Sequence, residues 1–224
     1  MHKAATTVKK SVTFYFDFIS PFAYLAFKAL PRAVQGTGYA VQYKPILFAA
    51  LLKKHGQLGP AEIKGKREWT YRHVMWLARQ SGLVLDIPAA HPFNPLELLR
   101  LALACDPAGT GAPSRDVCEA IFQHVWWGGD AADDPARISA LMAKLRCLPS
   151  DVSTVQVKDQ LRENTTAAAE LGLFGVPTCV ADGRLFWGLD ALPMLRQHLL
   201  QDCWFTDERW RAVESIPMGV QRPS

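Results

Sequence analysis

Ser20 lies where an apolar strand gives way to a helix, and a hydroxyl group in that place can hold an anion. Residues 12–24 form a near-continuous apolar run that predicts a buried central strand. Ser20 has the residue type of a helix N-cap, and Pro21 follows where its missing N–H costs nothing. Because helix N-termini favour negative charge, we expect Ser20 to be able to hydrogen-bond an anion such as a soluble thiolate.

A second informative stretch places Val176 and Pro177 between a glycine pair and a predicted strand. A cis bond before Pro177 would leave the backbone N–H and C=O of Val176 free to pair with an extended peptide in a groove. A trans proline that simply begins a strand explains the same residues. Both interpretations stay open at this point.

Residues 187–190, Trp-Gly-Leu-Asp, form a turn into the last predicted helix. One interpretation is that Asp190 is the N-cap of this helix. The other is that its carboxylate binds the ammonium group of a small peptide in the same groove. His73, Trp76 and the Trp126-Trp127 pair are interpreted as the core face of amphipathic helices.

The composition is that of an ordinary globular protein of 224 residues, 49% hydrophobic, with a net charge of +4. This charge and the absence of a Gly-rich phosphate loop do not indicate a nucleic-acid partner. The first eleven residues are polar and basic, so we expect neither a signal peptide nor a membrane span, and a cytoplasmic protein. Five scattered cysteines without a Cys-x-x-Cys pair favour reduced core thiols over disulfides or a metal site.

Positive charge is concentrated between residues 53 and 79, where seven Lys or Arg residues face only Glu62 and Glu68. One interpretation is a solvated helix face. The other is an electropositive rim that attracts small carboxylates.

The elements around these residues predict an α/β fold. A strand at 40–44 follows the first helix, a hairpin spans 177–187 around Asp182-Gly183, and a helix covers 190–200. Between them, helices are predicted at 62–81, 95–105, 114–127 and 135–145. We therefore expect a discontinuous thioredoxin-like domain (12–46 and 155–200), an all-helical insertion (47–154) and a C-terminal tail (201–224). The aromatic residues of that tail would pack on the domain or cover a partner subunit: Trp204, Phe205 and Trp210.

From about residue 12 to residue 200, the chain resembles the 2-hydroxychromene-2-carboxylate isomerase family. This family belongs, with the kappa-class glutathione transferases, to the DsbA-like thioredoxin superfamily. The resemblance is carried by five segments of the sequence: residues 14–25 (FYFDFISPFAYL), 66–67 (KR), 91–96 (HPFNPL), 174–178 (FGVPT) and 186–188 (FWG) with Asp190.

The resemblance implies glutathione as cofactor and assigns roles to individual residues. Ser20 would face the glutathione sulfur, and Val176 would pair with the glutathione backbone. The γ-glutamyl end would be lined by Trp187, Gly188, Leu189 and Asp190. Phe93 and Asn94 would lie near the second substrate, with Lys53 as a candidate from a looser alignment. Relatives are often dimers, so a homodimer is expected.

The reaction that the resemblance implies is a cis-trans isomerisation in the catabolism of aromatic hydrocarbons such as naphthalene. The thiolate would add to a conjugated double bond of an aromatic 2-oxo acid, the resulting single bond would rotate, and the thiolate would leave. The basic rim would hold the substrate carboxylate. The chain departs from the usual family pattern at positions that bear on the substrate rather than on the fold: Lys64, His73, Trp76, Leu189 and Ala191.

Three other functions remain open. A thiol–disulfide oxidoreductase needs two sulfurs, whereas residues 20–23 read Ser-Pro-Phe-Ala. A kappa-like transferase or peroxidase would use the same thiolate on another electrophile. A non-catalytic peptide-binding module would use the Val176-Pro177 groove, with Ser20 merely a helix cap.

Overall fold

The computed structural model describes residues 10–106 and 108–220, and everything below concerns these residues. The expectation of no signal peptide depends on the first residues of the chain, of which 1–9 lie outside this range. Along the described residues, no helix combines the length and the apolar composition needed to cross a membrane. The same residues contain no group of three or more His, Cys, Asp or Glu side chains able to hold a metal ion together.

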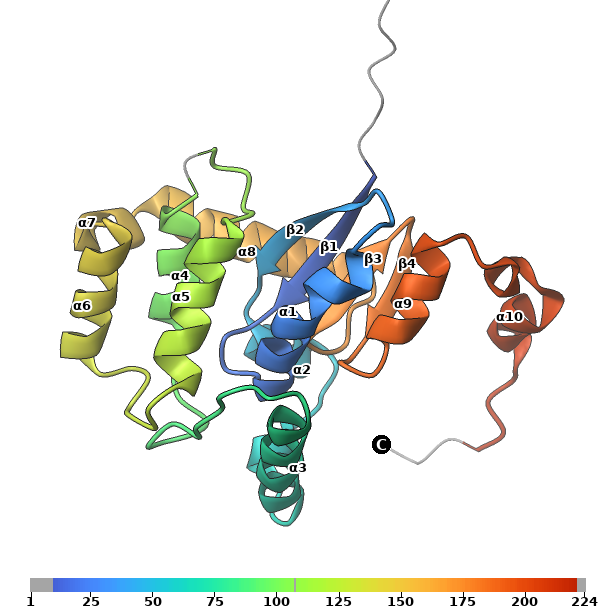
Figure 1. The fold of residues 1–224 in the computed structure, drawn as a ribbon, viewed down its shortest axis with the longest axis horizontal. Coiled ribbons are helices and arrows are strands. Elements are labelled where there is room, and N and C mark those ends of the chain that lie inside the picture. The colour runs from blue at the N-terminus through green and yellow to red at the C-terminus, as the bar shows by residue number, and fades with distance from the viewer. Residues whose placement is uncertain (1–9, 107, 221–224) are drawn as a thin grey trace, which may run out of the picture.

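A four-stranded mixed sheet with the order β2-β1-β3-β4 forms the centre of the molecule (Figure 1). β1 is an interior strand, as its apolar sequence predicted. It pairs in parallel with β2 and antiparallel with β3, and β3 pairs antiparallel with β4. The strands are β1 (Ser11–Phe16), β2 (Ala40–Pro45), β3 (Thr178–Ala181) and β4 (Arg184–Trp187).

The turn between β3 and β4 confirms the predicted hairpin. Asp182 and Gly183 both have positive φ, at 49° and 75°. This is the backbone of a two-residue type I′ turn, which suits the right-handed twist of the strands and is favoured by Asp-Gly.

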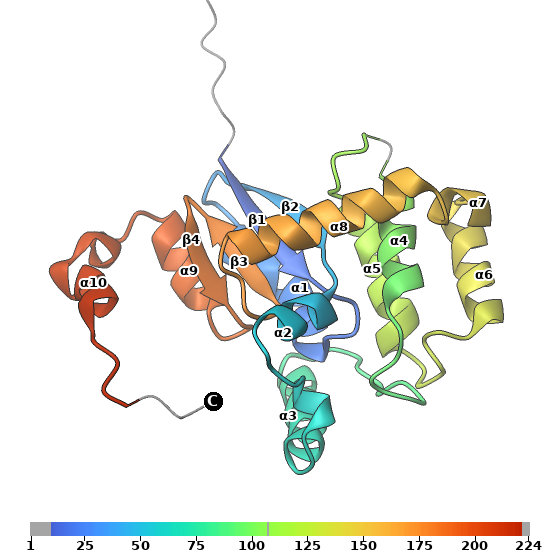
Figure 2. The ribbon, with the colours of Figure 1, turned by 180° about the vertical axis from the view of Figure 1, so that it is seen from behind.

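Helices cover both faces of the sheet. In Figures 1 and 2, α1 and α9 lie on one face, and α2 and α8 on the other. Side chains of β1 alternate between the two cores, because successive residues of a strand point to opposite faces. Phe14 and Phe16 enter the larger core, and Tyr15 enters the smaller one with Ile46 and Leu173. These helices are α1 (Pro21–Val34), α2 (Phe48–Lys54), α8 (Val155–Glu170) and α9 (Leu192–Leu199).

The helical segment between β2 and α8 agrees with the predicted helices to within a few residues at each end. In the figures α4 to α7 stand beside β2, and α3 projects from the sheet. The short helix α2 was not predicted. It packs against α8, which was assigned to the thioredoxin-like domain, whereas α2 was assigned to the insertion. The domain boundary at residue 47 therefore stays a prediction. The remaining helices are α3 (Lys66–Gln80), α4 (Leu96–Ala104), α5 (Arg115–Trp126), α6 (Pro135–Leu145) and α7 (Pro149–Val152).

Phe122 of α5 joins the insertion to the sheet. Its ring centroid lies 5.4 Å from that of Phe16, 4.8 Å from that of Phe18 and 5.0 Å from that of Phe27 on α1. Aromatic pairs at these distances add to the free energy of simple burial. The insertion and the sheet therefore share one core.

The C-terminal tail packs on the domain through Phe205. This residue is buried, with ring centroids 6.2 Å from Phe186 of β4 and 5.1 Å from His198 of α9. Of the two alternatives for the aromatic residues of the tail, the structure supports packing on the domain. The tail contains α10 (Glu208–Ala212) between two short 3-10 turns.

The turn that connects β1 to α1 contains a buried acid. Asp17 is fully buried, and its carboxylate accepts hydrogen bonds from the backbone N–H groups of Ile19 (3.1 Å) and Phe48 (2.9 Å). Burial raises the pKa of Asp17 to about 7, although these N–H groups act in the opposite direction by favouring the ionised form. Asp17 thereby links the turn before Ser20 to the first residue of α2.

The raised pKa of Asp17 predicts a pH dependence of stability. A carboxyl group whose pKa is higher in the folded than in the unfolded chain stabilises the fold most below its unfolded pKa, about 4. That contribution is lost as pH rises through the folded value of about 7. The Asp17→Asn variant cannot ionise. We expect the free energy of unfolding of the unmodified protein, relative to that of the variant, to fall by up to about 4 kcal/mol between pH 4 and 8.

Urea unfolding at several pH values measures this difference. Parallel pH profiles of the two proteins would show that Asp17 does not titrate in the fold over this range.

Candidate active site

The sheet register brings most of the predicted glutathione-site residues to one edge. Ser20 follows the C-terminal end of β1. Tyr15 of β1 pairs with Thr178, the first residue of β3, and Thr178 also pairs with Trp187, the last residue of β4. Val176 precedes β3, and residues 188–190 follow β4, so all of these lie at the same end of the three strands. Residues that are more than 150 positions apart in sequence thus share one edge.

Ser20 is the N-cap of α1, as predicted. Its Oγ accepts a hydrogen bond from the backbone N–H of Ala23 at 3.2 Å, and Pro21 opens the helix. Because this bond uses Ser20 as acceptor, the hydroxyl hydrogen remains available to donate to another group. Ser20 is 8% exposed. An anion that reached it would meet both a donor and the positive end of a 14-residue helix.

The segment before β3 packs closely against Trp187. A Cβ atom at Gly175 would lie 2.6 Å from the Trp187 Nε1 atom, so this contact needs glycine. The ring of Phe174 meets that of Trp187 edge-on at 5.0 Å, and the Gly188 N–H donates to the Pro177 carbonyl at 2.9 Å. Residues 174–177 and 187–188 therefore form one wall of the site.

The Val176–Pro177 peptide is cis, which was one of the two alternatives. Within the described part of the chain, neither the backbone N–H nor the C=O of Val176 has a hydrogen-bond partner. These groups are the ones an extended peptide would pair with.

Asp190 does not cap α9. The helix begins at Leu192 after Ala191, which makes no side-chain capping bond, so the N-cap interpretation of Asp190 is wrong. Asp190 is exposed, and its carboxylate folds over Gly188, whose φ of 97° and lack of a Cβ permit the contact. Leu189 lines a groove of about 580 Å³ between α1 and α9.

Two of the three predicted substrate residues lie in the loop before α4. Phe93 is buried with its ring centroid 6.0 Å from that of His91, and the exposed Asn94 accepts a hydrogen bond from the Leu96 N–H at 3.1 Å. The His91 side chain in turn reaches the carbonyl of Ile19, next to Ser20. Lys53 is exposed near the end of α2, and no hydrogen bond or ion pair of the described residues joins it to the others.

His91 is the centre of a polar network that the sequence did not reveal. Its Nε2 lies 2.7 Å from the Ile19 carbonyl, its Nδ1 lies 2.8 Å from the Tyr71 hydroxyl, and its own carbonyl accepts from Arg67 at 2.9 Å. Burial lowers the pKa of His91, with a smaller effect of Arg67 in the same direction, so the ring is neutral near pH 7. Since Nε2 faces an acceptor, it carries the hydrogen. The buried Asp17 was also not singled out from the sequence, although an acid at the end of an apolar strand is a recognisable signal.

The aromatic residues of α3 form an exposed ladder. Trp69 and Trp76 are 64% and 56% exposed, and His73 stacks between them with ring centroids at 5.8 and 6.4 Å. His73 also meets Phe22 of α1 edge-on at 5.8 Å. The interpretation of Trp76 as core is therefore wrong, and so is that of Trp127, which is 39% exposed. That of Trp126, which is fully buried, is confirmed. The Trp69–His73–Trp76 ladder reaches the first turn of the helix that Ser20 caps.

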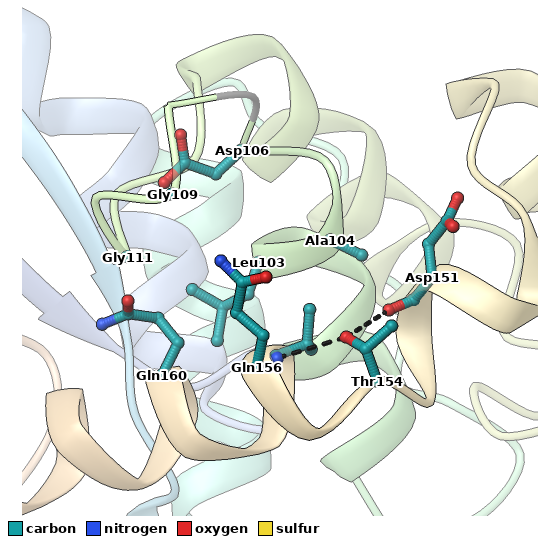
Figure 3. A pocket seen from close by; sticks show the side chains of 10 residues that line it. Leu103, Ala104, Asp106, Gly109, Gly111, Asp151, Thr154, Gln156 and Gln160 are labelled. Carbon is teal, nitrogen blue, oxygen red and sulfur yellow. Dashed lines mark hydrogen bonds between the residues drawn. The ribbon is translucent and has the colours of Figure 1, made fainter.

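Away from this edge, a cavity of about 250 Å³ lies between the loop after α4 and the first turns of α8 (Figure 3). None of the predicted site residues lines it. The Asp106 carboxylate in this loop accepts hydrogen bonds from the backbone of Thr110 and Ala112. It holds the loop together.

Comparison with known proteins identifies the family and the fold. The model of the DSBA-like thioredoxin domain family matches residues 11–200. The 2-hydroxychromene-2-carboxylate isomerase of Pseudomonas putida is 30% identical over 86% of this chain and 95% of its own. Glutathione S-transferase kappa 1 of Rattus norvegicus is 25% identical over 85% of this chain and 90% of its own.

A solved structure of a 2-hydroxychromene-2-carboxylate isomerase is 28% identical and superimposes with a TM-score of 0.73 over 92% of this chain and 100% of that one. The predicted fold class and the predicted relationship are both confirmed. The chain belongs to the DsbA-like thioredoxin family and, within it, to the relatives of 2-hydroxychromene-2-carboxylate isomerase.

Proposed function

We propose that this protein is a glutathione-dependent isomerase that acts on conjugated aromatic 2-oxo acids of the 2-hydroxychromene-2-carboxylate type. The similarity to named isomerases supports an isomerase of this family. The observation that carries the glutathione dependence is the register of β1, β3 and β4, which sets a serine-capped helix end beside an unpaired peptide backbone at one edge of the sheet.

Glutathione would lie along this edge in an extended conformation. Its sulfur would accept a hydrogen bond from Ser20, and its backbone would pair with Val176. Its γ-glutamyl end would reach the 187–190 turn, where the exposed Asp190 carboxylate suits an ammonium group. The kappa transferases among the relatives are named for the same cofactor.

The Ser20 hydrogen bond would make the thiol of glutathione a better nucleophile. A free thiol has a pKa of about 8.5, and only the thiolate attacks. A hydrogen bond to a charged group contributes about 1.5–3 kcal/mol, and one pKa unit corresponds to about 1.4 kcal/mol. Ser20 would therefore lower the thiol pKa by about one to two units, with the helix end adding a fraction. Most of the bound glutathione would then be ionised at neutral pH.

The thiolate would add to the conjugated double bond of the substrate, and the electron pair would move toward the 2-oxo group. Rotation about the resulting single bond and expulsion of the thiolate would give the isomer and regenerate glutathione. Phe93 and Asn94 would contact the aromatic part, and the basic side chains of α2 and α3, with Lys53 among them, would attract the carboxylate. A homodimer and a cytoplasmic location belong to the same proposal.

The chain's own cysteines are poorly suited to replace glutathione. Burial raises the pKa of Cys118 and Cys147, and it raises those of Cys105 and Cys179 to about 12. Only Cys203, in the C-terminal tail, is exposed, contrary to its expected place in the core. Because thiols with raised pKa values are weak nucleophiles, a disulfide oxidoreductase is disfavoured.

Purified protein with 2-hydroxychromene-2-carboxylate, with and without glutathione, tests the function. We expect turnover only with glutathione. Turnover without it would contradict the proposed mechanism. Saturable glutathione binding with activity on chlorinated aromatics or hydroperoxides instead would favour a kappa-like transferase or peroxidase, and no glutathione binding would favour the peptide-binding module.

Replacement of Ser20 by alanine should lower turnover at neutral pH about tenfold to thirtyfold, because bound glutathione loses one to two units of pKa lowering and a thiol with a pKa of about 8.5 keeps only a few per cent thiolate at pH 7. It should also cost about 1 kcal/mol of stability through the lost cap. Ser114→Ala is the matched control, since Ser114 caps α5 by the same bond to the Val117 N–H at 3.3 Å. Steady-state rates and thermal unfolding of both variants are compared, and equal activities would remove Ser20 from the mechanism.

Asp190→Asn should raise the KM for glutathione about tenfold, with little change in kcat, because it removes a charged partner of the ammonium group remote from the sulfur. Asp133→Asn, at another exposed aspartate, serves as the control. Steady-state kinetics with glutathione as the varied substrate gives both constants. An unchanged KM in Asp190→Asn would place the γ-glutamyl end elsewhere.

A further inference from the structure

Two histidines of this chain, the buried His91 and the half-buried His124, share two kinds of hydrogen bond in different places. His91 Nε2 lies 2.7 Å from the Ile19 carbonyl, and His124 Nε2 lies 2.9 Å from the Ala132 carbonyl. The backbone carbonyl of each accepts from an arginine, Arg67 or Arg137, at 2.9 Å. Burial lowers the pKa of both histidines. Only His91 is bonded to the residue that precedes Ser20.

The peptide between Ile19 and Ser20 is held at both of its polar groups. The Ile19 carbonyl accepts from His91, and the Ser20 N–H donates to the Asp17 carbonyl at 3.1 Å. A peptide unit is planar, so fixing its C=O and its N–H fixes its orientation. Together with the Ser20 φ of −89°, the orientation of this plane sets the direction of the Ser20 Cα–Cβ bond, from which the hydroxyl extends.

The His91 ring is itself held on every side. The Tyr71 hydroxyl bonds Nδ1, and the rings of Phe93 and Trp126 have centroids 6.0 and 5.6 Å from that of His91. The charged and titratable groups bonded to His91 are the Arg67 guanidinium and the Tyr71 hydroxyl. The buried Asp17 carboxyl bonds the N–H of Ile19, the residue whose carbonyl accepts from His91. Arg67 and Tyr71 belong to α3, which also carries part of the basic rim.

We propose that His91 is a positioning residue for Ser20: its Nε2–H···O bond to Ile19 orients the peptide from which the Ser20 hydroxyl is presented to the glutathione sulfur. The catalytic consequence of this inference rests on the proposed function. Its structural part, the fixed Ile19–Ser20 peptide, stands without glutathione. Tyr71 supports it by holding the hydrogen of His91 on Nε2.

The test compares His91→Phe, which keeps a ring and removes the donor, with His91→Gln, whose amide can replace that donor. His124→Phe is the matched control, since it removes the corresponding bond to Ala132. The first readout is the pH titration of the ultraviolet absorbance of the thiolate of bound glutathione. We expect the midpoint in His91→Phe to rise by about one pH unit, which leaves about tenfold less thiolate at low pH. The midpoint should return toward that of the unmodified protein in His91→Gln and should not move in His124→Phe.

The second readout is amide hydrogen exchange of Ser20 without glutathione, which separates the inference from the proposed function. Faster exchange of Ser20 in His91→Phe than in His124→Phe supports the positioning role even if the protein binds no glutathione. Equal exchange, or an unmoved thiolate midpoint together with a lower melting temperature, would show that His91 is only structural. If His91→Phe does not fold, Tyr71→Phe takes its place. We then expect the thiolate midpoint to rise by a smaller amount, and an unchanged midpoint would contradict the inference.

Discussion

The turn from Asp17 to Ser20 must bury backbone polar groups in an apolar interior, and each of them needs a partner there. Partners come from distant elements: the Asp17 carboxylate accepts from the first residue of α2, the Phe18 carbonyl accepts from the Trp126 indole at 3.0 Å, and the Ile19 carbonyl accepts from His91. Each bond ties one part of the helical insertion to the end of β1. The position of Ser20 therefore depends on the packing of most of the chain.

This arrangement divides the proposed work of the site between two parts of the molecule. The sheet edge supplies the groups suited to a thiol peptide, because three strands end or begin there. The insertion supplies the loop with Phe93 and Asn94, and it shares its core with the sheet through Phe122. Because residues of the insertion bond to the turn before Ser20, the insertion also holds Ser20 in place at the sheet edge.

The surface of α3 combines exposed aromatic rings with basic side chains. Trp69 and Trp76 remain largely exposed with His73 stacked between them, on a helix rich in Lys and Arg. Exposed aromatic rings beside positive charge are suited to flat anionic molecules. At the start of α9, Ala191 makes no side-chain capping bond. The neighbouring Asp190 is exposed.

The sequence by itself determined the features that depend on neighbouring residues: the Ser20 cap, the Asp182-Gly183 hairpin, most helices and the interior strand. It missed α2, because seven residues carry too little periodicity to indicate a helix. Tertiary structure decided which aromatic residues are buried, since Trp76 and Trp126 both fit a helical pattern and only Trp126 is in the core. It also decided the role of His91, whose partner Ile19 is 72 positions away. Local patterns follow from chain geometry, whereas burial and long-range hydrogen bonds exist only after distant segments have packed together.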